Sequence, residues 1–374
     1  MAKKKIAFAI WDIGNTGGAQ RVIGLVANEL CSEYEVHVVN LYGFPEDRGP
    51  SIPLDPRVKV VYLGHGKMPR LRKAITGSFN PLRKYLKREK IDVCLLQTTY
   101  MGVIGAPVAL WNKVFGGRHR TRFVFHDHGA VGAQLDDRSI TGIRWISAKI
   151  ADRTIALTKR SASDYVRKLH IPARKIRVIT NWIDPAINPE GIRADLSAKK
   201  ILWAGRLSKE KGALRIPEIA RLVLPGFPDW TWHVYGDGPQ REELEAKLAE
   251  YGLQDQVILE GNSDNLYAEL PKYSIGTLTS DMEGMPMFLL ETAAFQMPCV
   301  SFDVTTGPNE IIDDGATGYL VKPFNIDEFA GKLKLLMESE DRRRAFSQAQ
   351  MAVKQEFDSA SILPRWVAML NEWK

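Results

Sequence analysis

Cysteine is scarce in this chain of 374 residues, and long hydrophobic runs are absent. The three cysteines, Cys31, Cys94 and Cys299, each lie in an apolar segment and lack the spacing of metal ligands. This pattern excludes a disulfide scaffold and a zinc module, and it is typical of reduced core thiols in a cytosolic protein. Residues 101–111 form the longest apolar stretch after the N-terminal one, and they are far fewer than the roughly 20 that a membrane-spanning helix needs.

The N-terminus resembles a secretion signal, because a cluster of lysines precedes an apolar run. Asp12 breaks that run after about seven residues, and a glycine-rich loop follows it. A first buried strand is therefore the better interpretation of this segment.

The length of the chain exceeds what one hydrophobic core usually supports, so two domains are expected. In both halves short β-branched segments alternate with helical patterns, which predicts parallel sheets covered on both faces. Residues 184–198 are rich in proline and lack apolar periodicity, as a linker does. We predict an α/β protein with doubly wound domains at 1–184 and 199–355, a linker at 185–198, and an amphipathic helix within 356–374 that packs back on the first domain. Ligands of open α/β sheets bind beyond the carboxyl ends of the strands, so a cleft between the domains is the expected site.

The net charge of +7 hides an asymmetry between the two halves of the chain. Residues 1–185 contain 31 Lys and Arg against 15 Asp and Glu, a balance of +16, which leaves 20 against 29, or −9, for the remainder. Residues 67–90 alone hold nine basic residues and one glutamate, interleaved with apolar ones. Such a segment either rests on an anionic bilayer or forms a solvated helix face. Arg118, Arg120 and Arg122 would add to the same positive field.

The stretch "GNTGGAQRV", residues 14–22, follows the first expected strand and opens the first expected helix. Successive glycines let the backbone approach an anion, and the helix N-terminus supplies free N–H groups and a positive dipole. The stretch is neither GxGxxG nor a P-loop, and a plain tight turn explains it equally well.

The stretch "AGRLSKEKG", residues 204–212, stands in the same relation to the first expected strand of the second domain. Arg206 and Lys211 would leave the strand end together, where two cations could neutralise a diphosphate without a metal. The alternative is a solvated basic loop.

The stretch "EGMPMFLLE" places two glutamates around the start of a helix. Pro286 suits a first helical turn, so Glu283 lies in the preceding loop and Glu291 within the helix. The N–H groups of Met285, Met287 and Phe288 would be unsatisfied donors at the positive helix end. A sugar nucleotide has sugar hydroxyls, then a diphosphate, then a ribose. An anion site with an acidic acceptor on either side matches this order. The alternative makes Glu283 a dipole partner and Glu291 a surface residue, but the apolar sequence around Glu291 calls for a specific partner.

Six motifs together resemble those of a known enzyme family, and the resemblance covers nearly the whole chain. "GGAQRV", "FVFHD", "GRLSKEKG", "GDGP", "EGMPMFLLE" and "TTGPNEII" occur in the order and spacing of the family 4 retaining glycosyltransferases, whose GT-B fold has two Rossmann-like domains with an interdomain cleft. The resemblance implies a hexosyltransferase that moves a sugar from a nucleotide-diphosphate sugar, with UDP expected, to a glycan or lipid-linked saccharide in surface polysaccharide or glycolipid synthesis. It further implies metal-independent catalysis without a cofactor, in the cytoplasm and peripheral to the inner face of the membrane.

The resemblance also assigns expected roles at the matching positions, with Glu283 and His126 as the catalytic residues. The residues expected to bind the donor diphosphate are Gly17, Gly18, Arg206, Lys211, Met287 and Phe288. Those expected to bind the donor sugar are Glu283, Gly284, Met285 and Pro286. Glu291 is expected to bind the ribose, and Asn262 and Ser263 the nucleobase. His128 rivals His126, and either histidine can instead be structural. Met285 departs from the pattern, since relatives often carry an aromatic residue or leucine there.

Two other functions compete with the transferase. A sugar-nucleotide epimerase also binds UDP-sugars between two Rossmann domains, although the paired glutamates fit it less well. A non-enzymatic nucleic-acid binder would suit the pI near 9.1, but no recognition module is present and the acidic second half is unexplained by it, so no nucleic-acid partner is expected. A nicotinamide dehydrogenase is disfavoured, because GxGxxG followed by an acidic residue is missing.

Overall fold

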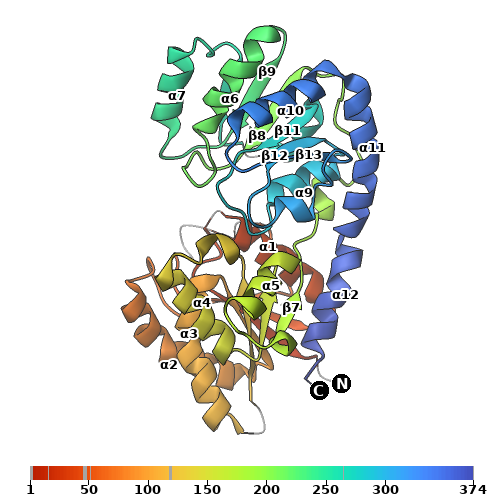
Figure 1. The fold of residues 1–374 in the computed structure, drawn as a ribbon. Coiled ribbons are helices and arrows are strands. Elements are labelled where there is room, and N and C mark those ends of the chain that lie inside the picture. The colour runs from red at the N-terminus through yellow and green to blue at the C-terminus, as the bar shows by residue number, and fades with distance from the viewer. Residues whose placement is uncertain are drawn as a thin grey trace. The chain divides into compact units, whose positions relative to one another are not determined.

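The computed structural model describes residues 3–15, 17–44, 49–50, 52–117, 120–263 and 265–373, so Arg118 lies outside the described residues. The chain divides into two compact units (Figure 1). The first comprises Met1–Thr180 together with Leu363–Lys374, and the second comprises Asn181–Ile362. The C-terminal segment thus belongs to the same unit as the N-terminal half of the chain.

The first unit is a seven-stranded parallel sheet in the order β3-β2-β1-β4-β5-β6-β7. Its strands are β1 (Lys5–Ile10), β2 (Glu35–Asn40), β3 (Lys59–Tyr62), β4 (Val93–Gln97), β5 (Arg122–Asp127), β6 (Arg153–Ala156) and β7 (Ile176–Val178). Its helices are α1 (Gly18–Leu30), α2 (Leu71–Glu89), α3 (Thr99–Phe115), α4 (Arg138–Ile150), α5 (Lys159–Arg167) and most of α12 (Ser359–Leu370).

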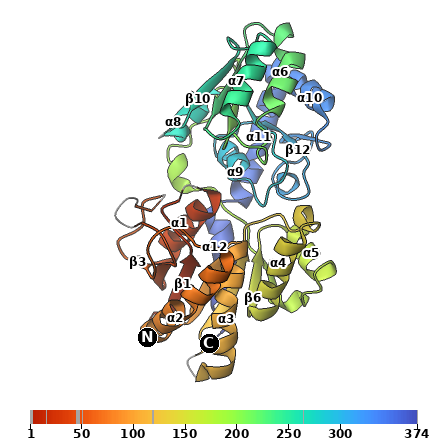
Figure 2. The ribbon, with the colours of Figure 1, turned by 90° about the vertical axis from the view of Figure 1, so that its left-hand side faces the viewer.

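Helices cover both faces of this sheet. Ala7 and Ala9 of β1 share a core with α2 and α3 on one face. Phe8, which points to the other face, packs against Trp366 of α12 with ring centroids 6.4 Å apart. Figure 2 shows α2 and α3 side by side, with α4 next to α3. The strands are buried on both faces, which explains why their sequences read as continuous apolar runs.

The second unit contains a six-stranded parallel sheet in the order β10-β9-β8-β11-β12-β13. Its strands are β8 (Lys200–Ala204), β9 (Thr231–Tyr235), β10 (Val257–Gly261), β11 (Ile275–Leu278), β12 (Cys299–Phe302) and β13 (Gly318–Val321). Its helices are α6 (Arg215–Val223), α7 (Arg241–Glu250), α8 (Leu266–Glu269), α9 (Met287–Ala294), α10 (Ile326–Glu338) and α11 (Glu340–Glu356). Both orders are those of doubly wound dinucleotide-binding sheets, which confirms the predicted fold class.

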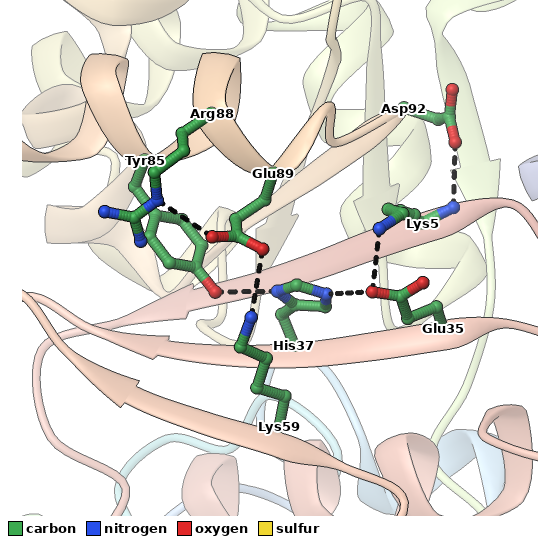
Figure 3. Close-up of polar contacts among 8 residues, drawn as sticks. All are labelled: Lys5, Glu35, His37, Lys59, Tyr85, Arg88, Glu89 and Asp92. Carbon is green, nitrogen blue, oxygen red and sulfur yellow. Dashed lines mark hydrogen bonds and ion pairs between the residues drawn. The ribbon is translucent and has the colours of Figure 1, made fainter.

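A polar network ties together the amino ends of the first three strands (Figure 3). His37 of β2 is fully buried, and its Nε2 lies 3.1 Å from Glu35 while its Nδ1 lies 2.6 Å from the Tyr85 hydroxyl. Burial lowers the pKa of His37, so the ring is neutral and Tyr85 donates to Nδ1. Glu35 also pairs with Lys5 of β1 at 2.9 Å. The network lies at the edge opposite the carboxyl ends of the strands, which gives it a structural role.

We expect Tyr85→Phe to destabilise the first unit by about 1 to 3 kcal/mol, because it leaves Nδ1 of the buried His37 without a donor. Urea denaturation followed by far-UV circular dichroism measures this loss. Tyr100→Phe is the control, because Tyr100 is exposed. Equal unfolding midpoints for the two variants would contradict the role given to the Tyr85 hydroxyl.

Candidate functional site

The switch point of the second sheet lies between β8 and β11, where the strand order reverses. The loops that follow these two strands are joined through Thr279. Its hydroxyl accepts from Trp203 Nε1 at 2.9 Å and lies 3.1 Å from the carbonyl oxygens of Lys211 and Gly212. Gly212 has φ of +65°, and a Cβ built on it would lie 2.0 Å from the Thr279 carbonyl oxygen. Only glycine fits this close approach of the two loops.

An ion pair crosses the same two loops. Lys211 Nζ lies 2.7 Å from Glu283 Oε1, and the same oxygen accepts a 2.7 Å hydrogen bond from the Ser280 hydroxyl. Glu283 is only 8% exposed, and Thr306 donates to its backbone carbonyl oxygen. Glu283 Oε2 accepts no hydrogen bond from any residue that the structure describes. One carboxylate oxygen is therefore fixed, and the other can accept from a ligand hydroxyl.

Arg215, at the start of α6, fastens the loop that carries Glu283. Its Nη1 donates to the Thr279 carbonyl oxygen at 3.0 Å and pairs with the Asp281 carboxylate. The guanidinium also lies 4.4 Å from the ring centroid of Phe324, in the loop after β13. Sequence reasoning missed this arginine, which lies just beyond "GRLSKEKG"; an arginine opening the apolar segment "ALRIPEIA" was the available signal.

We expect Arg215→Met to lower kcat/KM for the donor about 10- to 100-fold, because the loop that carries Glu283 would lose its fastening to α6. Arg221→Met on the same helix is the control, because Arg221 contacts Glu218 in a surface ion pair and the Tyr251 ring, neither of which belongs to the loop of Glu283. A double-mutant cycle with Lys211→Ala separates positioning from general destabilisation. Strictly additive losses would show that Arg215 does not act through the Lys211–Glu283 pair.

Helix α9 begins at Met287, directly after Pro286, so its first turn presents free N–H groups beside the loop of Glu283. Met285 and Phe288 are buried. Glu291 is buried within the helix, and the Tyr267 hydroxyl of α8 donates to its Oε1 at 3.2 Å. The carboxylate thus has a specific polar partner, while its contact with a ribose stays a prediction.

The remaining expected donor contacts of this unit lie in exposed loops. Arg206 is exposed after β8 and forms no ion pair within the described part of the chain. Asn262 and Ser263 are exposed after β10, and Ser263 accepts from the Asn265 N–H at 3.2 Å. In the same segment Tyr267 reaches Glu291, which links this loop to α9. Lys211, Glu283 and the start of α9 thus come together, and their roles toward a ligand stay predictions.

The first unit holds the glycines and histidines of the expected site. Gly17 and Gly18 are exposed at the start of α1, after the carboxyl end of β1; Thr16 lies outside the described residues. His126, at the end of β5, is 1% exposed, and its ring lies edge-on to Trp366 of α12 with centroids 5.3 Å apart. Such burial fits a structural histidine, and a catalytic contact would require the ring to become exposed.

Gln97 joins the two rival histidines. Its Oε1 lies 2.9 Å from His126 Nδ1 and 3.1 Å from His128 Nε2. Burial is the main reason why the pKa of His126 lies well below its usual value and that of His128 is lowered to about 4. Both rings are therefore neutral near pH 7. His128 is only partly buried, so it is the one closer to solvent.

A metal centre has no obvious donors in the described ranges. Among those residues no group of three or more His, Cys, Asp and Glu side chains could hold a metal ion. Metal independence stays a prediction, because it has to be measured on the reaction itself. No helix within the described residues is long and apolar enough to cross a membrane.

Comparison with known protein families identifies the family to which the chain belongs. Residues 16–187 match the family described as Glycosyltransferase Family 4, and residues 187–352 match the one described as Glycosyl transferases group 1. The chain belongs to the family 4 glycosyltransferases. The assignment favours the transferase over the epimerase and the nucleic-acid binder.

Relatives and solved structures are similar to this chain over nearly its full length. The amylovoran biosynthesis glycosyltransferase of Erwinia amylovora is 26% identical over 98% of this chain and 99% of its own length. A Campylobacter jejuni enzyme, an α-1,4-N-acetyl-D-galactosaminyltransferase named for a PP-undecaprenol saccharide, is 28% identical over 99% of each chain. The structure of TarM from S. aureus in complex with UDP has a TM-score of 0.80 at 16% identity, covering 99% of this chain and 100% of that one. Anabaena HepE in complex with UDP and glucose has a TM-score of 0.79 at 17% identity with the same coverage. These neighbours confirm the predicted GT-B fold.

Proposed function

We propose that this glycosyltransferase moves a sugar from a UDP-sugar to a hydroxyl of a lipid-linked saccharide, with retention of the anomeric configuration. One observation carries the proposal: the Lys211–Glu283 pair lies at the switch point, with Glu283 in the loop that leads into α9, and Glu283 Oε2 accepts no hydrogen bond from the described residues. A cation, free helix N–H groups and a carboxylate at one strand edge suit a diphosphate joined to a sugar.

The donor diphosphate would recruit Lys211, together with Arg206 and the N–H groups of Met287 and Phe288. The glycosidic C1–O bond to the phosphate would break as charge develops on the departing diphosphate, and these cations and dipoles would stabilise that charge. Glu283 would meanwhile accept hydrogen bonds from hydroxyls of the transferred sugar and hold the ring in position.

The acceptor hydroxyl would attack C1 from the face that the diphosphate leaves. A new C1–O bond would form there, and the acceptor proton would pass to an oxygen of the departing diphosphate. Glu283 already accepts from Lys211 and Ser280, so it is suited to hydrogen bonding rather than to covalent attack. Trapping a glycosyl-enzyme on Glu283 would refute same-face transfer.

The names of two relatives support the proposed acceptor class. The Campylobacter jejuni enzyme is named for a PP-undecaprenol saccharide, and the Erwinia amylovora one for amylovoran biosynthesis. A lipid-linked acceptor would hold the enzyme at the inner face of the cytoplasmic membrane, where the basic segment 67–90 would meet anionic lipid.

The test is nucleotide release from a panel of UDP-, GDP- and ADP-sugars, with and without crude lipid-linked glycan and in excess EDTA. We expect one UDP-sugar to release UDP only with acceptor and regardless of EDTA, and NMR of the product to show the donor's anomeric configuration. An epimerase would convert the donor without acceptor, and release of GDP or ADP alone would refute the UDP assignment.

A further inference from the structure

Helix α3 presents an apolar ridge to solvent along its last turns. The ridge consists of Leu110, Trp111, Val114 and Phe115, which are 53%, 41%, 65% and 63% exposed. The same helix buries Ile104, Val108 and Ala109 in the core of the first unit. Trp111 and Phe115 follow Val108 by three and seven positions, so they continue its side of the helix into the last turns, where they are exposed, while Leu110 and Val114 point away from that side. Isolated exposed apolar side chains are ordinary, but four within two turns form a patch that calls for a partner.

The neighbouring helices extend this surface. α2, α3 and α4 lie side by side on one face of the first sheet (Figures 1 and 2). On the α4 side Trp145 is 46% exposed, and the Lys149 ammonium lies 5.7 Å from its ring centroid. On the α2 side the Arg83 guanidinium lies 5.5 Å from the Trp111 ring centroid. The apolar ridge is thus bordered by cations on both sides.

Positive charge on α2 is largely uncompensated. Lys73, Lys84 and Lys87 are exposed and form no ion pair with any residue that the structure describes. Arg88, by contrast, pairs with Glu89 at 2.9 Å. Long basic side chains beside exposed aromatic and aliphatic ones are typical of surfaces that lie in the interface of an anionic bilayer.

We propose that the apolar ridge of α3 inserts into the headgroup and acyl boundary of an anionic bilayer while the lysines of α2 contact lipid phosphates. A second copy of the chain fits this face less well, because a symmetric contact would bring the basic α2 helices against each other. The inference deepens the proposed membrane contact by naming the surface that penetrates. It needs neither donor nor acceptor, so its failure would leave the transferase proposal standing.

Vesicle sedimentation with the full-length protein tests the insertion. With phosphatidylglycerol–phosphatidylcholine vesicles we expect Val114→Asp/Phe115→Asp to reduce binding at least tenfold at both low and high salt. Lys84→Glu/Lys87→Glu should reduce mainly the salt-sensitive part of binding. Ile192→Asp is the matched control, an apolar residue of the second unit that is 47% exposed and should leave binding unchanged. Equal binding of the ridge variant and wild type would overturn the proposal.

A site-specific probe gives a second readout that does not depend on how well the aspartate variant folds. The native Cys31, Cys94 and Cys299 are all buried, so an environment-sensitive dye can be attached selectively to a Val114→Cys variant. We expect its emission to shift to the blue on addition of anionic vesicles and to be quenched by lipids brominated near the headgroup. An unchanged spectrum would contradict insertion. Dimerisation in light scattering that the ridge variant abolishes would assign the face to a second copy instead.

Discussion

Glu283→Gln should lower kcat about 100- to 1,000-fold, the loss typical of removing one preorganised polar group at a reacting centre. The substitution keeps the volume and an oxygen for Ser280, but it removes the charge that Lys211 neutralises at 2.7 Å. It also weakens the acceptor that the transferred sugar's hydroxyls would use. Initial rates of UDP release at saturating donor and acceptor measure the loss.

The affinity of the Glu283→Gln variant for UDP is a second property, and it is measured independently of the rate. Because Lys211 no longer pairs with a carboxylate, UDP should bind as tightly as in wild type or more tightly. Calorimetry measures this affinity. Glu269→Gln is the control, since Glu269 pairs with Lys272 at an exposed site. A Glu283→Gln enzyme within threefold of the wild-type rate would remove this residue from the proposed chemistry.

Gly212→Ala should abolish most activity and lower the stability of the second unit. The new Cβ would lie 2.0 Å from the Thr279 carbonyl oxygen and 2.5 Å from Arg215 Nη1, so the loops of Lys211 and Glu283 would have to separate. Alanine at a positive φ alone costs about 1 to 2 kcal/mol, and the clash adds to that cost. Thermal unfolding and donor turnover measure the two effects.

Gly252→Ala is a closely matched control for this substitution. Gly252 has the same φ of +65°, but a Cβ there would meet nothing within 4 Å. Gly252→Ala should therefore lower the stability only by the cost of placing alanine at a positive φ, and its donor turnover should equal that of the wild type. If both variants lost stability and activity equally, the close approach of the two loops would not matter for the site.

Much of the fold could be predicted from the sequence. The alternation of strand and helix patterns identified two doubly wound domains, because parallel strands buried on both faces leave continuous apolar runs. Pro286 and the apolar residues after it located the start of α9. The compact units divide after residue 180, and Asn181, the first residue of the second unit, donates to the Met285 carbonyl oxygen at 3.4 Å.

The rest depended on contacts between distant parts of the chain. Arg215 and Thr279 are 64 positions apart, and no local pattern predicts that they meet. His126 packs against Trp366 of the C-terminal helix, which is 240 positions further on in the numbering. Which face of α3 turns to solvent is likewise decided by its packing between α2 and α4, since the segment is apolar all round.

A crystal structure of the full-length protein with UDP bound tests the account most directly. We expect diphosphate oxygens within hydrogen-bond distance of Lys211 Nζ and of the N–H groups in the first turn of α9, with the ribose hydroxyls on Glu291. The Lys211–Glu283 ion pair should be opened or shared in that complex. Ordered UDP bound elsewhere, with the Lys211–Glu283 pair unchanged at 2.7 Å, would contradict the assignment of the donor site.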